Sequence, residues 1–405
     1  MTGIMRRTIG LLLGLSLAWC NMTWAATPAD TIRAQGTWGQ VRLDTRYRYE
    51  LVDETGKETA RASTLRLRLG YGTPVLQGLQ VYGEVEGLQA VGADRYNSLR
   101  NGRTQYAIVA DPEKAELNQL WLEVRWIPRT RLRIGRQRIT YDNHRFIGNV
   151  GWRQLEQTYD AASVTSRPLP DLVINGAYLW RVQNVLSQRQ RLAAPLLHLT
   201  YTGWPAMRIV IYGYWIGYEA QVYATRSVQT YGVRLEGRRL LTDRLTLRYT
   251  GEWAYQRDYY DNPNDFAVQY THGLVGLTMQ QDGWTISVSG ALELFTSDNG
   301  VAFSTPLATL HAFQGWADRF LRTPPQGLRD LYASLSVRRG RVQVTGVYHD
   351  FASDDGNVAY GRELDLVASY VLTPNLSLLV KYAAYDARSW SVDVQKYWFM
   401  LDFRF

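Results

Sequence analysis

Arginine side chains recur at every second position in several segments of this chain, and they are well suited to binding an anion. Arginine stays charged at all physiological pH values, and its planar guanidinium group can hold a carboxylate through two hydrogen bonds. Charged side chains that surround a water-filled passage favour ions of the opposite sign. The sequence therefore predicts an anion-selective interior, and the strand positions that would line it include Arg42, Arg46, Arg66, Arg68, Arg125 and Arg248.

Acidic residues close to these arginines offer them a second role. Asp44 lies within the first arginine-rich segment, and Glu123 comes two residues before Arg125. An ion pair between neighbouring side chains would only hold the wall together, whereas a pair beside a constriction would also affect selectivity. Both interpretations stay open for any single arginine.

No catalytic or metal-binding motif accompanies these charges. The histidines are scattered, and the sequence has neither a Gly-x-Ser-x-Gly nucleophile elbow nor a His-Glu-x-x-His zinc motif. The one cysteine, Cys20, can form neither a disulfide framework nor a paired-cysteine zinc site. We therefore expect no enzyme activity, no cofactor and no metal, although a serine–histidine pair on adjacent strands would leave no motif.

The elements that carry these side chains show a period of two. In the segment 41–51, most residues of one parity are apolar or aromatic, and those of the other parity are mostly charged. Such alternation indicates β-strands, because successive strand side chains point to opposite faces. We count about eighteen such segments, at 37–50, 61–72, 79–90, 116–127, 131–139, 157–167, 171–181, 194–203, 206–216, 227–237, 244–256, 268–280, 284–295, 328–338, 341–352, 361–372, 376–386 and 393–405.

The connections between these segments alternate between short and long. Pro128-Arg129-Thr130 and Gly203-Trp204-Pro205 are turn-like, whereas 91–115, 182–193 and 296–327 are longer. A charge on a lipid-facing position costs about 2–4 kcal/mol at the membrane midplane, so the charged faces should point into a lumen. We therefore predict an all-β fold: a transmembrane, antiparallel, up-and-down β-barrel of about 18 strands, with short periplasmic turns and longer extracellular loops.

The first residues have the pattern of a targeting segment. Arg6 and Arg7 precede an apolar stretch, and Ala25 ends a suitable cleavage site. We predict a cleaved signal peptide over residues 1–25 and a single barrel domain over residues 26–405. The whole chain carries 45 Lys and Arg against 37 Asp and Glu, an excess that suits an anionic partner.

Other classes of protein are excluded or disfavoured. Beyond the N-terminus, no apolar stretch approaches the ~18 residues of a spanning helix, which excludes a polytopic helical membrane protein. A soluble β-sandwich or propeller is the alternative to a barrel, but we find no internal repeat, and the chain ends in an aromatic strand at Phe405. Secretion and the strand placement of the basic residues argue against a nucleic-acid partner.

Several motifs occur in order along the chain: Gly135-Arg136-Gln137-Arg138-Ile139, Asp142-Asn143, Arg145-Phe146-Ile147-Gly148-Asn149, Val347-Tyr348-His349-Asp350-Phe351, Gly361-Arg362-Glu363-Leu364-Asp365-Leu366-Val367 and Asp402-Phe403-Arg404-Phe405. Together they resemble the alginate export family of Gram-negative outer-membrane proteins. The resemblance implies an 18-stranded monomeric barrel whose arginine-lined constriction passes a polyanionic polysaccharide outward.

Carried over motif by motif, the resemblance implies that Arg136, Arg138 and Arg362 line the lumen, with Glu363 and Asp365 as acidic companions. This chain is shorter than the alginate exporter. For that reason the resemblance supports the fold more strongly than it supports the substrate.

The alternation and the resemblance disagree for two of these residues. Leu132 and Ile134 share the parity of Arg136 and Arg138 and have the character of lipid-facing residues. Either a bulge near Gly135 turns the strand over, or both arginines lie above the membrane at the mouth of the barrel.

The long connections could narrow the opening. One of them, 140–156, adds Arg145 and Arg153 to the predicted pore-lining residues. It could fold inward as a constriction loop or lie outside as an ordinary external loop, and the same alternatives apply to the other long connections. The longest, 296–327, contains a helix-like piece from Ala308 to Leu321 that could sit over or inside the opening.

These observations predict a channel in the bacterial outer membrane that passes an anionic, uronate-rich polysaccharide such as alginate. The alternatives are a porin-like diffusion channel for small anionic or sugar solutes, and a structural barrel or adhesin with a blocked lumen. The expected partners are outer-membrane lipid, the transported anion, and the assembly machinery that would recognise the last strand through Phe405. We expect a monomer.

Overall fold

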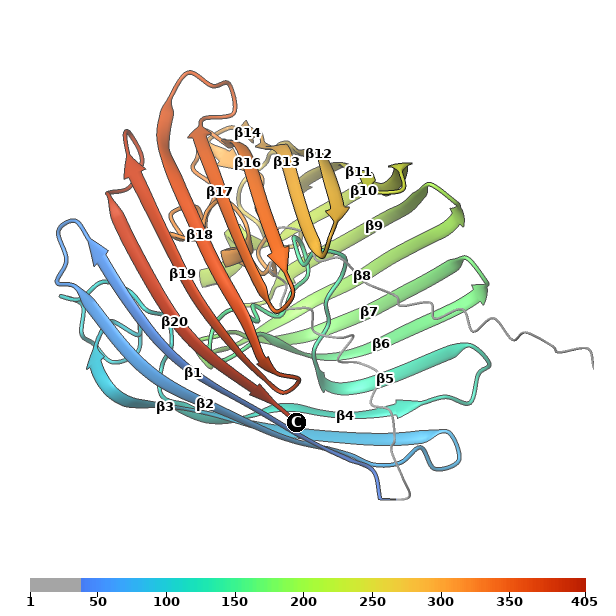
Figure 1. The fold of residues 1–405 in the computed structure, drawn as a ribbon. Coiled ribbons are helices and arrows are strands. Elements are labelled where there is room, and N and C mark those ends of the chain that lie inside the picture. The colour runs from blue at the N-terminus through green and yellow to red at the C-terminus, as the bar shows by residue number, and fades with distance from the viewer. Residues whose placement is uncertain (1–37) are drawn as a thin grey trace, which may run out of the picture.

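Eighteen antiparallel strands form a closed barrel in the computed structural model, which describes residues 38–405 (Figure 1). Each strand pairs with the next along the barrel wall, and the last pairs with the first, so the sheet has no free edge. The barrel strands are β1 (Gln40–Glu54), β2 (Ala60–Gly72), β3 (Leu79–Arg95), β4 (Lys114–Val124), β5 (Thr130–Gln137), β6 (Thr158–Leu169), β7 (Leu172–Gln183), β8 (Arg189–Trp204), β9 (Met207–Tyr218), β10 (Val228–Thr242), β11 (Leu245–Asp258), β12 (Ala267–Gln281), β13 (Trp284–Phe295), β16 (Leu328–Arg339), β17 (Val342–Ala352), β18 (Ala359–Thr373), β19 (Leu376–Ala387) and β20 (Val394–Arg404). The strand number predicted from the alternation is confirmed, whereas the predicted signal peptide lies outside the described residues.

The two faces of the wall differ as the alternation predicts. In β2, Leu65, Leu67 and Leu69 are exposed on the outer face, while Arg66 and Arg68 between them are buried. Apolar side chains on the outside and charged side chains on the inside suit a barrel that is surrounded by lipid and has a polar interior.

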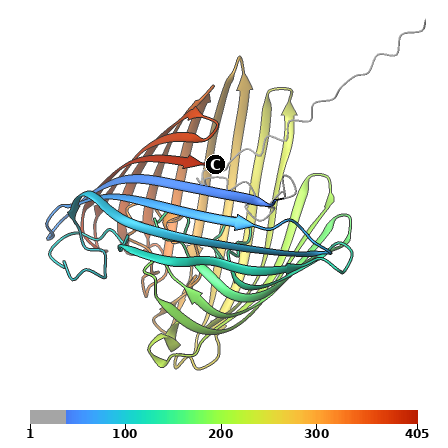
Figure 2. The ribbon, with the colours of Figure 1, turned by 90° about the horizontal axis from the view of Figure 1, so that it is seen from below.

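The strands are strongly tilted, as closure of a barrel requires. Figure 2 shows the blue strands β1–β3 crossing in front of the yellow strands of the opposite wall. One end of the barrel carries only tight turns, and Phe405 lies at this end, where its backbone pairs with Leu43. We call this the short-turn end and the opposite end the long-loop end.

Strand β8 begins earlier than the sequence predicts. Pairing of Gln183 with Arg189 extends the β7–β8 ladder, so the connection is only 184–188 instead of 182–193. Arg189 and Arg191, which precede the predicted start of the strand at residue 194, both occupy exposed outer positions at which a charged side chain does not oppose strand formation.

Two connections fill the centre of the barrel, and a third, 96–113, reaches the interior through buried Asp111, which accepts the backbone N–H of Gln154 at 3.0 Å. We call residues 138–157, between β5 and β6, the first inner loop, and residues 303–327, before β16, the second inner loop. Most residues of the stretch 145–157 are buried, as are Phe303, Leu307 and Ala317 of the second inner loop. Of the two alternatives for the connections 140–156 and 296–327, folding into the barrel or lying outside it, the structure therefore shows folding into the barrel.

The predicted helix from Ala308 to Leu321 is wrong. Only Leu310–Ala312 forms a short 3-10 helix, η2. Gln314, Gly315 and Asp318 have positive φ angles, and wall carboxylates accept the backbone N–H groups of Trp316 and Ala317 that a helix would have used. The wall contacts therefore replace helical hydrogen bonds.

The remaining elements are small. A 3-10 helix, η1 (Gln221–Arg226), follows β9, and the short strands β14 (Ser297–Asp298) and β15 (Val301–Ala302) pair before the second inner loop. Neither helix in the described part of the chain has the length and hydropathy needed to cross a membrane.

Candidate functional site: two inner loops and the wall that holds them

Four arginines of β1 and β2 bind the main chain of the first inner loop. Alternation directs Arg46 and Arg48 of β1, and Arg66 and Arg68 of β2, into the barrel, where all four are buried. Their guanidinium groups donate to backbone carbonyl oxygens of Gly151, Trp152, Arg153 and Gln154. For example, Arg46 Nη1 lies 3.1 Å from Gly151 O, and Arg68 Nη2 lies 3.3 Å from Gln154 O. These arginines therefore anchor the loop.

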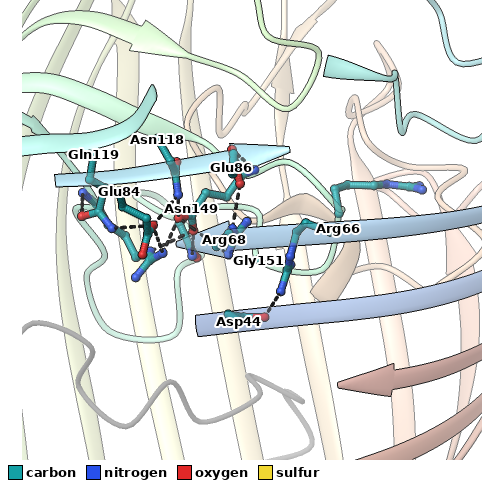
Figure 3. Close-up of polar contacts among 12 residues, drawn as sticks. Asp44, Arg66, Arg68, Glu84, Glu86, Asn118, Gln119, Asn149 and Gly151 are labelled. Atoms are coloured by element: carbon teal, nitrogen blue, oxygen red, sulfur yellow. Dashed lines mark hydrogen bonds and ion pairs between the residues drawn. The ribbon is translucent and has the colours of Figure 1, made fainter. Parts of the chain in front are cut away.

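Carboxylates complete the surroundings of the same arginines. Arg46 Nε lies 2.8 Å from Asp402 of β20, and Arg68 Nε lies 2.7 Å from Glu86 of β3. Arg66 is paired with Asp44 (Figure 3). Because a buried charge without a partner is strongly destabilising, the wall and the loop depend on each other. The ion-pair interpretation thus describes all of these arginines, and contact with a solute stays a prediction.

Glu156 of the first inner loop is the centre of a second group of contacts. Arg138 Nε lies 2.8 Å from Glu156, and Asn118 of β4 donates to both Glu156 and Glu84, at 2.6 and 2.7 Å. Figure 3 shows Glu84 and Asn118 side by side on their adjacent strands. Burial alone would raise the pKa of Glu156, but the guanidinium groups of Arg138 and Arg68 hold it well below its ordinary value.

Arg136 does not join this group. The pairing of β4 with β5 runs without a shift through Gly135, so Arg136 keeps the outward parity of Ile134. Its guanidinium group is held by Asp160 of β6, with 2.7 Å between Nε and Oδ1. Arg138 follows the last residue of β5 and reaches inward to Glu156. Of the two alternatives, the bulge at Gly135 is therefore absent, and Arg136 lies on the outer face of the barrel and not in the lumen, where the resemblance placed it.

Arg362 is a second correction. In β18 it alternates with buried Glu363 and shares the outer face with exposed Leu364 and Leu366. Its side chain is 46% exposed and pairs with Asp350, with 3.0 Å between Nε and Oδ2. The resemblance placed Arg362 in the lumen, but the strict period of two places it outside.

Glu363 and Asp365 point inward and hold the second inner loop. Glu363 accepts the backbone N–H of Ala317 at 2.6 Å, and Asp365 accepts that of Trp316 at 3.1 Å. The wall therefore uses cations to bind carbonyl oxygens of one loop and carboxylates to bind N–H groups of the other.

His311 joins the two loops to the wall. Its ring stacks on Trp152 of the first inner loop with 4.5 Å between centroids. Nδ1 lies 2.7 Å from Asp318, and Lys381 of β19 donates to Nε2 at 2.8 Å. Burial lowers the pKa of His311 well below its ordinary value, and the hydrogen bond from His311 together with the charges of Lys396 and Arg153 holds the pKa of Asp318 low despite its burial.

Sequence reasoning missed this group as a site. Lys381 and Lys396 alternate with apolar residues in the last two strands, which identifies them as inward-facing. No sequence signal pointed to His311 and Asp318, because their partners lie on a distant strand and on the other loop.

Arg145 and Arg153 of the first inner loop are both buried and paired. Arg145 reaches the opposite wall, where Nη2 is 3.3 Å from Glu293 of β13. Arg153 bonds Asp318 of the second inner loop at 2.8 Å. Backbone hydrogen bonds from Gly148 N–H to Leu307 O and from Thr309 N–H to His144 O reinforce this contact, so the two loops form one packed unit.

Three predicted arginines remain at the short-turn end. Arg42, Arg125 and Arg248 have the inward parity of their strands and are partly exposed. Arg125 pairs with Glu123 at 2.6 Å, and Arg248 lies directly opposite Arg238 of β10. This end of the interior is therefore a basic vestibule that water can reach.

Between the second inner loop and strands β12–β17 lies a cavity of about 40 Å³. His272, Asp330 and His349 contribute to its lining. It can hold a water molecule, whose share of liquid volume is about 30 Å³, but not a sugar. Within residues 38–405, no cluster of His, Cys, Asp and Glu has a geometry that could hold a metal ion.

Comparisons with known proteins agree with this architecture. Several solved structures of outer-membrane proteins share the fold. OpdK of Pseudomonas aeruginosa, determined with vanillate, is 13% identical with a TM-score of 0.70, covering 91% of this chain and 100% of that chain. OccAB2 of Acinetobacter baumannii is 16% identical with a TM-score of 0.72, covering 92% and 99%. OccK9 (OpdG) of P. aeruginosa is 16% identical with a TM-score of 0.71, covering 91% and 99%.

A comparison with curated proteins found no match. A family model described as alginate export, however, matches residues 37–294, which is more than half of the chain. The closed barrel, its apolar outer face and its likeness to outer-membrane proteins make the short-turn end periplasmic and the long-loop end extracellular. The chain therefore belongs to the alginate export family and forms a β-barrel channel of the bacterial outer membrane.

Proposed function

We propose that this channel passes small anionic solutes, such as single uronate sugars and other carboxylates, by passive diffusion. The observation that carries the proposal is the first inner loop, which lies inside the barrel with its carbonyl oxygens bound by four wall arginines. A polysaccharide strand needs a continuous wide opening, whereas a small solute needs only a narrow path beside the loop.

The periplasmic vestibule supports the preference for anions. Arg42, Arg125, Arg238 and Arg248 line it at inward positions, and all are at least partly exposed. A low-dielectric wall focuses the field of such charges and raises the local concentration of anions. The deeper arginines contribute less, because they are buried, whereas the vestibule arginines, including Arg125 beside its partner Glu123, are partly exposed to water. OpdK, which shares the fold, was determined with vanillate, itself a carboxylate.

Single-channel recording in planar bilayers tests the proposal. We expect a reversal potential that indicates anion preference in a salt gradient, and brief current interruptions when monomeric galacturonate is added. The triple variant Arg42→Gln, Arg125→Gln, Arg248→Gln should lose most of this preference, whereas Arg362→Gln, on the outer face, should keep it. Cation preference of the unaltered channel would contradict the proposal.

Export of an acidic polysaccharide is the second candidate, and the match to the alginate export family favours it. It requires the inner loops to separate or leave the lumen. Ile147 and Leu307, one on each loop, are backbone neighbours in an isolated β-bridge, so a pair of cysteines there has a geometry suited to a disulfide.

The double variant Ile147→Cys, Leu307→Cys separates the two candidates. A fluorescent oligouronate trapped in liposomes reports polymer passage, and labelled galacturonate reports passage of the small solute. Diffusion of small anions predicts that oxidation leaves galacturonate efflux unchanged and that the oligomer never escapes. Oligomer efflux that oxidation stops and a reductant restores would instead support polymer export. The two single-cysteine variants are the controls.

A further inference from the structure

A separate group of arginines lies on the outer surface of the barrel, at the extracellular ends of β5 to β8. Strand pairing places Arg136 opposite Asp160, and Asp160 opposite Arg181. Arg191 of β8 is next in the row, opposite Arg181, and Arg189 follows two residues from it on the same face. We call these five residues the outer arginine cluster.

The cluster faces away from the lumen. The next row toward the periplasm contains Ile134 and Tyr178, which are 54% and 48% exposed on the outer face. Tyr159 and Val182, which follow the opposite parity, are buried inside the barrel. Tyrosine is enriched where the hydrocarbon of a membrane meets the headgroups. The outer arginine cluster therefore lies one row beyond that level, beside the headgroups of the outer leaflet.

The charges within the cluster do not balance. Asp160 is held by Arg136 through two hydrogen bonds of 2.7 and 3.2 Å, and it also lies 3.0 Å from Arg181. Within residues 38–405, neither Arg189 nor Arg191 forms an ion pair, and both are exposed. Among the five residues, four guanidinium groups thus face the single carboxylate of Asp160, and Glu219, opposite Arg191 beyond the end of β9, is the next nearest acid along the row. Like charges on directly opposed strand positions, as at Arg181 and Arg191, repel each other.

Part of the cluster is fixed in position. The side-chain oxygen of Gln183 accepts hydrogen bonds from Arg136 at 2.7 Å and from Arg189 at 3.1 Å. Arg181 is oriented by Asp160, and its side chain is still 34% exposed. The connection 184–188 beside the cluster is short, and the first inner loop folds into the barrel, so neither forms a long external loop above these strands.

We propose that the outer arginine cluster binds the phosphate group of a phosphorylated glycolipid in the outer leaflet, of the lipid A class. Guanidinium groups bind phosphate through paired, charge-assisted hydrogen bonds. The apolar surface directly below would contact the acyl chains, and the bound phosphate would remove the repulsion between Arg181 and Arg191. This site is independent of the solute that passes through the lumen.

Native mass spectrometry of the detergent-purified channel tests the proposal, with diphosphorylated lipid A added as the probe. A second probe is lipid A with the same acyl chains but without phosphates. We expect lipid A to bind, and the dephosphorylated form to bind on the order of tenfold more weakly, since a hydrogen bond to a charged group commonly contributes that much affinity. The double variant Arg181→Gln, Arg191→Gln should lose lipid A binding by a similar factor.

Arg257→Gln is the matched control, because Arg257 also lies on the outer face at the extracellular end but outside the cluster. It should bind lipid A as the unaltered protein does. Equal binding of the two lipids, or an equal loss in Arg257→Gln, would overturn the proposal. Displacement of lipid A by inorganic phosphate would assign the site to the free ion and equally overturn it. If the double variant does not fold, Arg191→Gln alone serves, because its exposed side chain forms no ion pair.

Discussion

Arg48 is completely buried although it carries a full charge, and its contacts explain how this is possible. Nη1 lies 3.3 Å from Asp111, Nη2 donates to the carbonyl of Trp152, and the guanidinium carbon lies 4.6 Å from the centroid of the Trp152 ring. Each contact comes from a segment distant in sequence. At this scale, the arginines of the interior are structural partners of the first inner loop.

Replacing Arg48 with methionine should release the first inner loop. Breaking a buried pair by removing one partner costs about 3–5 kcal/mol, which is enough to populate conformations with the loop undocked. We expect larger and noisier single-channel currents from Arg48→Met, with Arg362→Gln on the outer face as the unaffected control. Unchanged conductance with weaker anion preference would instead show that Arg48 contacts the permeating ion.

Docking of the loops should also depend on pH through His311. Its pKa is lowered by burial when the loops are docked and returns to its ordinary value near 6.5 when they are released. The docked state therefore binds fewer protons than the released state. The free energy that favours docking falls as the pH drops below about 6.5, by at most 1.36 kcal/mol for each pH unit. The depressed pKa of Asp318 acts only at lower pH, below about 3.8.

Recordings at pH 7.5 and pH 5.5 measure this effect. We expect open, noisy events to become more frequent at the lower pH, by up to about tenfold for each unit below 6.5. In His311→Gln this dependence should disappear, since glutamine does not titrate. The same dependence in the variant would mean that another group controls docking.

At the scale of single elements, strand β5 depends on Gly135. Its φ angle is +122°, which other residues adopt with strain, and an added Cβ would meet the carbonyl oxygen of Leu120 on β4. This close approach lets the β4–β5 ladder continue to Arg136, which places that arginine in the outer cluster. The first inner loop then begins directly after the strand.

Gly135→Val should therefore weaken the barrel. Strained backbone of this kind costs about 1–3 kcal/mol, so the variant should unfold at a lower temperature when folded and unfolded bands are separated on a gel. Gly251→Ala is the matched control, because its added Cβ would meet nothing within 4 Å. Equal unfolding temperatures for the two variants would contradict this account.

At the scale of the whole molecule, buried arginines and the carboxylates that bind the second inner loop are concentrated in different strands of the wall. Arginines dominate β1 and β2, whereas Glu293, Asp330, Glu363 and Asp365 lie inside β13, β16 and β18. The two inner loops fill the interior, and each is bound by one of these two groups of strands. Closure of the barrel depends instead on the β1–β20 ladder, in which the loops take no part.

Replacing residues 143–154 with a short glycine–serine linker should consequently leave a folded barrel. We expect a higher conductance, because the lumen is emptied, and a stronger anion preference, because Arg46, Arg48, Arg66 and Arg68 lose their carbonyl partners and face water. Higher conductance without a gain in anion preference would show that the wall carboxylates already neutralise these arginines.

The sequence by itself determined the barrel, because the two faces of a strand are a local property with a period of two. The period of two predicts the number of strands and the inward direction of Arg46, Arg66 and Arg68. It also predicts that Arg362 faces outward, in contrast to the lumenal position that the resemblance implied.

Only the tertiary structure decided where the long connections go. The hydrogen bonds from Arg46 to the Gly151 carbonyl and from the Ala317 N–H to Glu363 join residues that are 105 and 46 positions apart. Docking of these loops depends on wall side chains that only the closed barrel brings close to them. A local sequence pattern does not predict which distant side chains these are. For the same reason, the outer arginine cluster became visible only when strand pairing aligned its four strands.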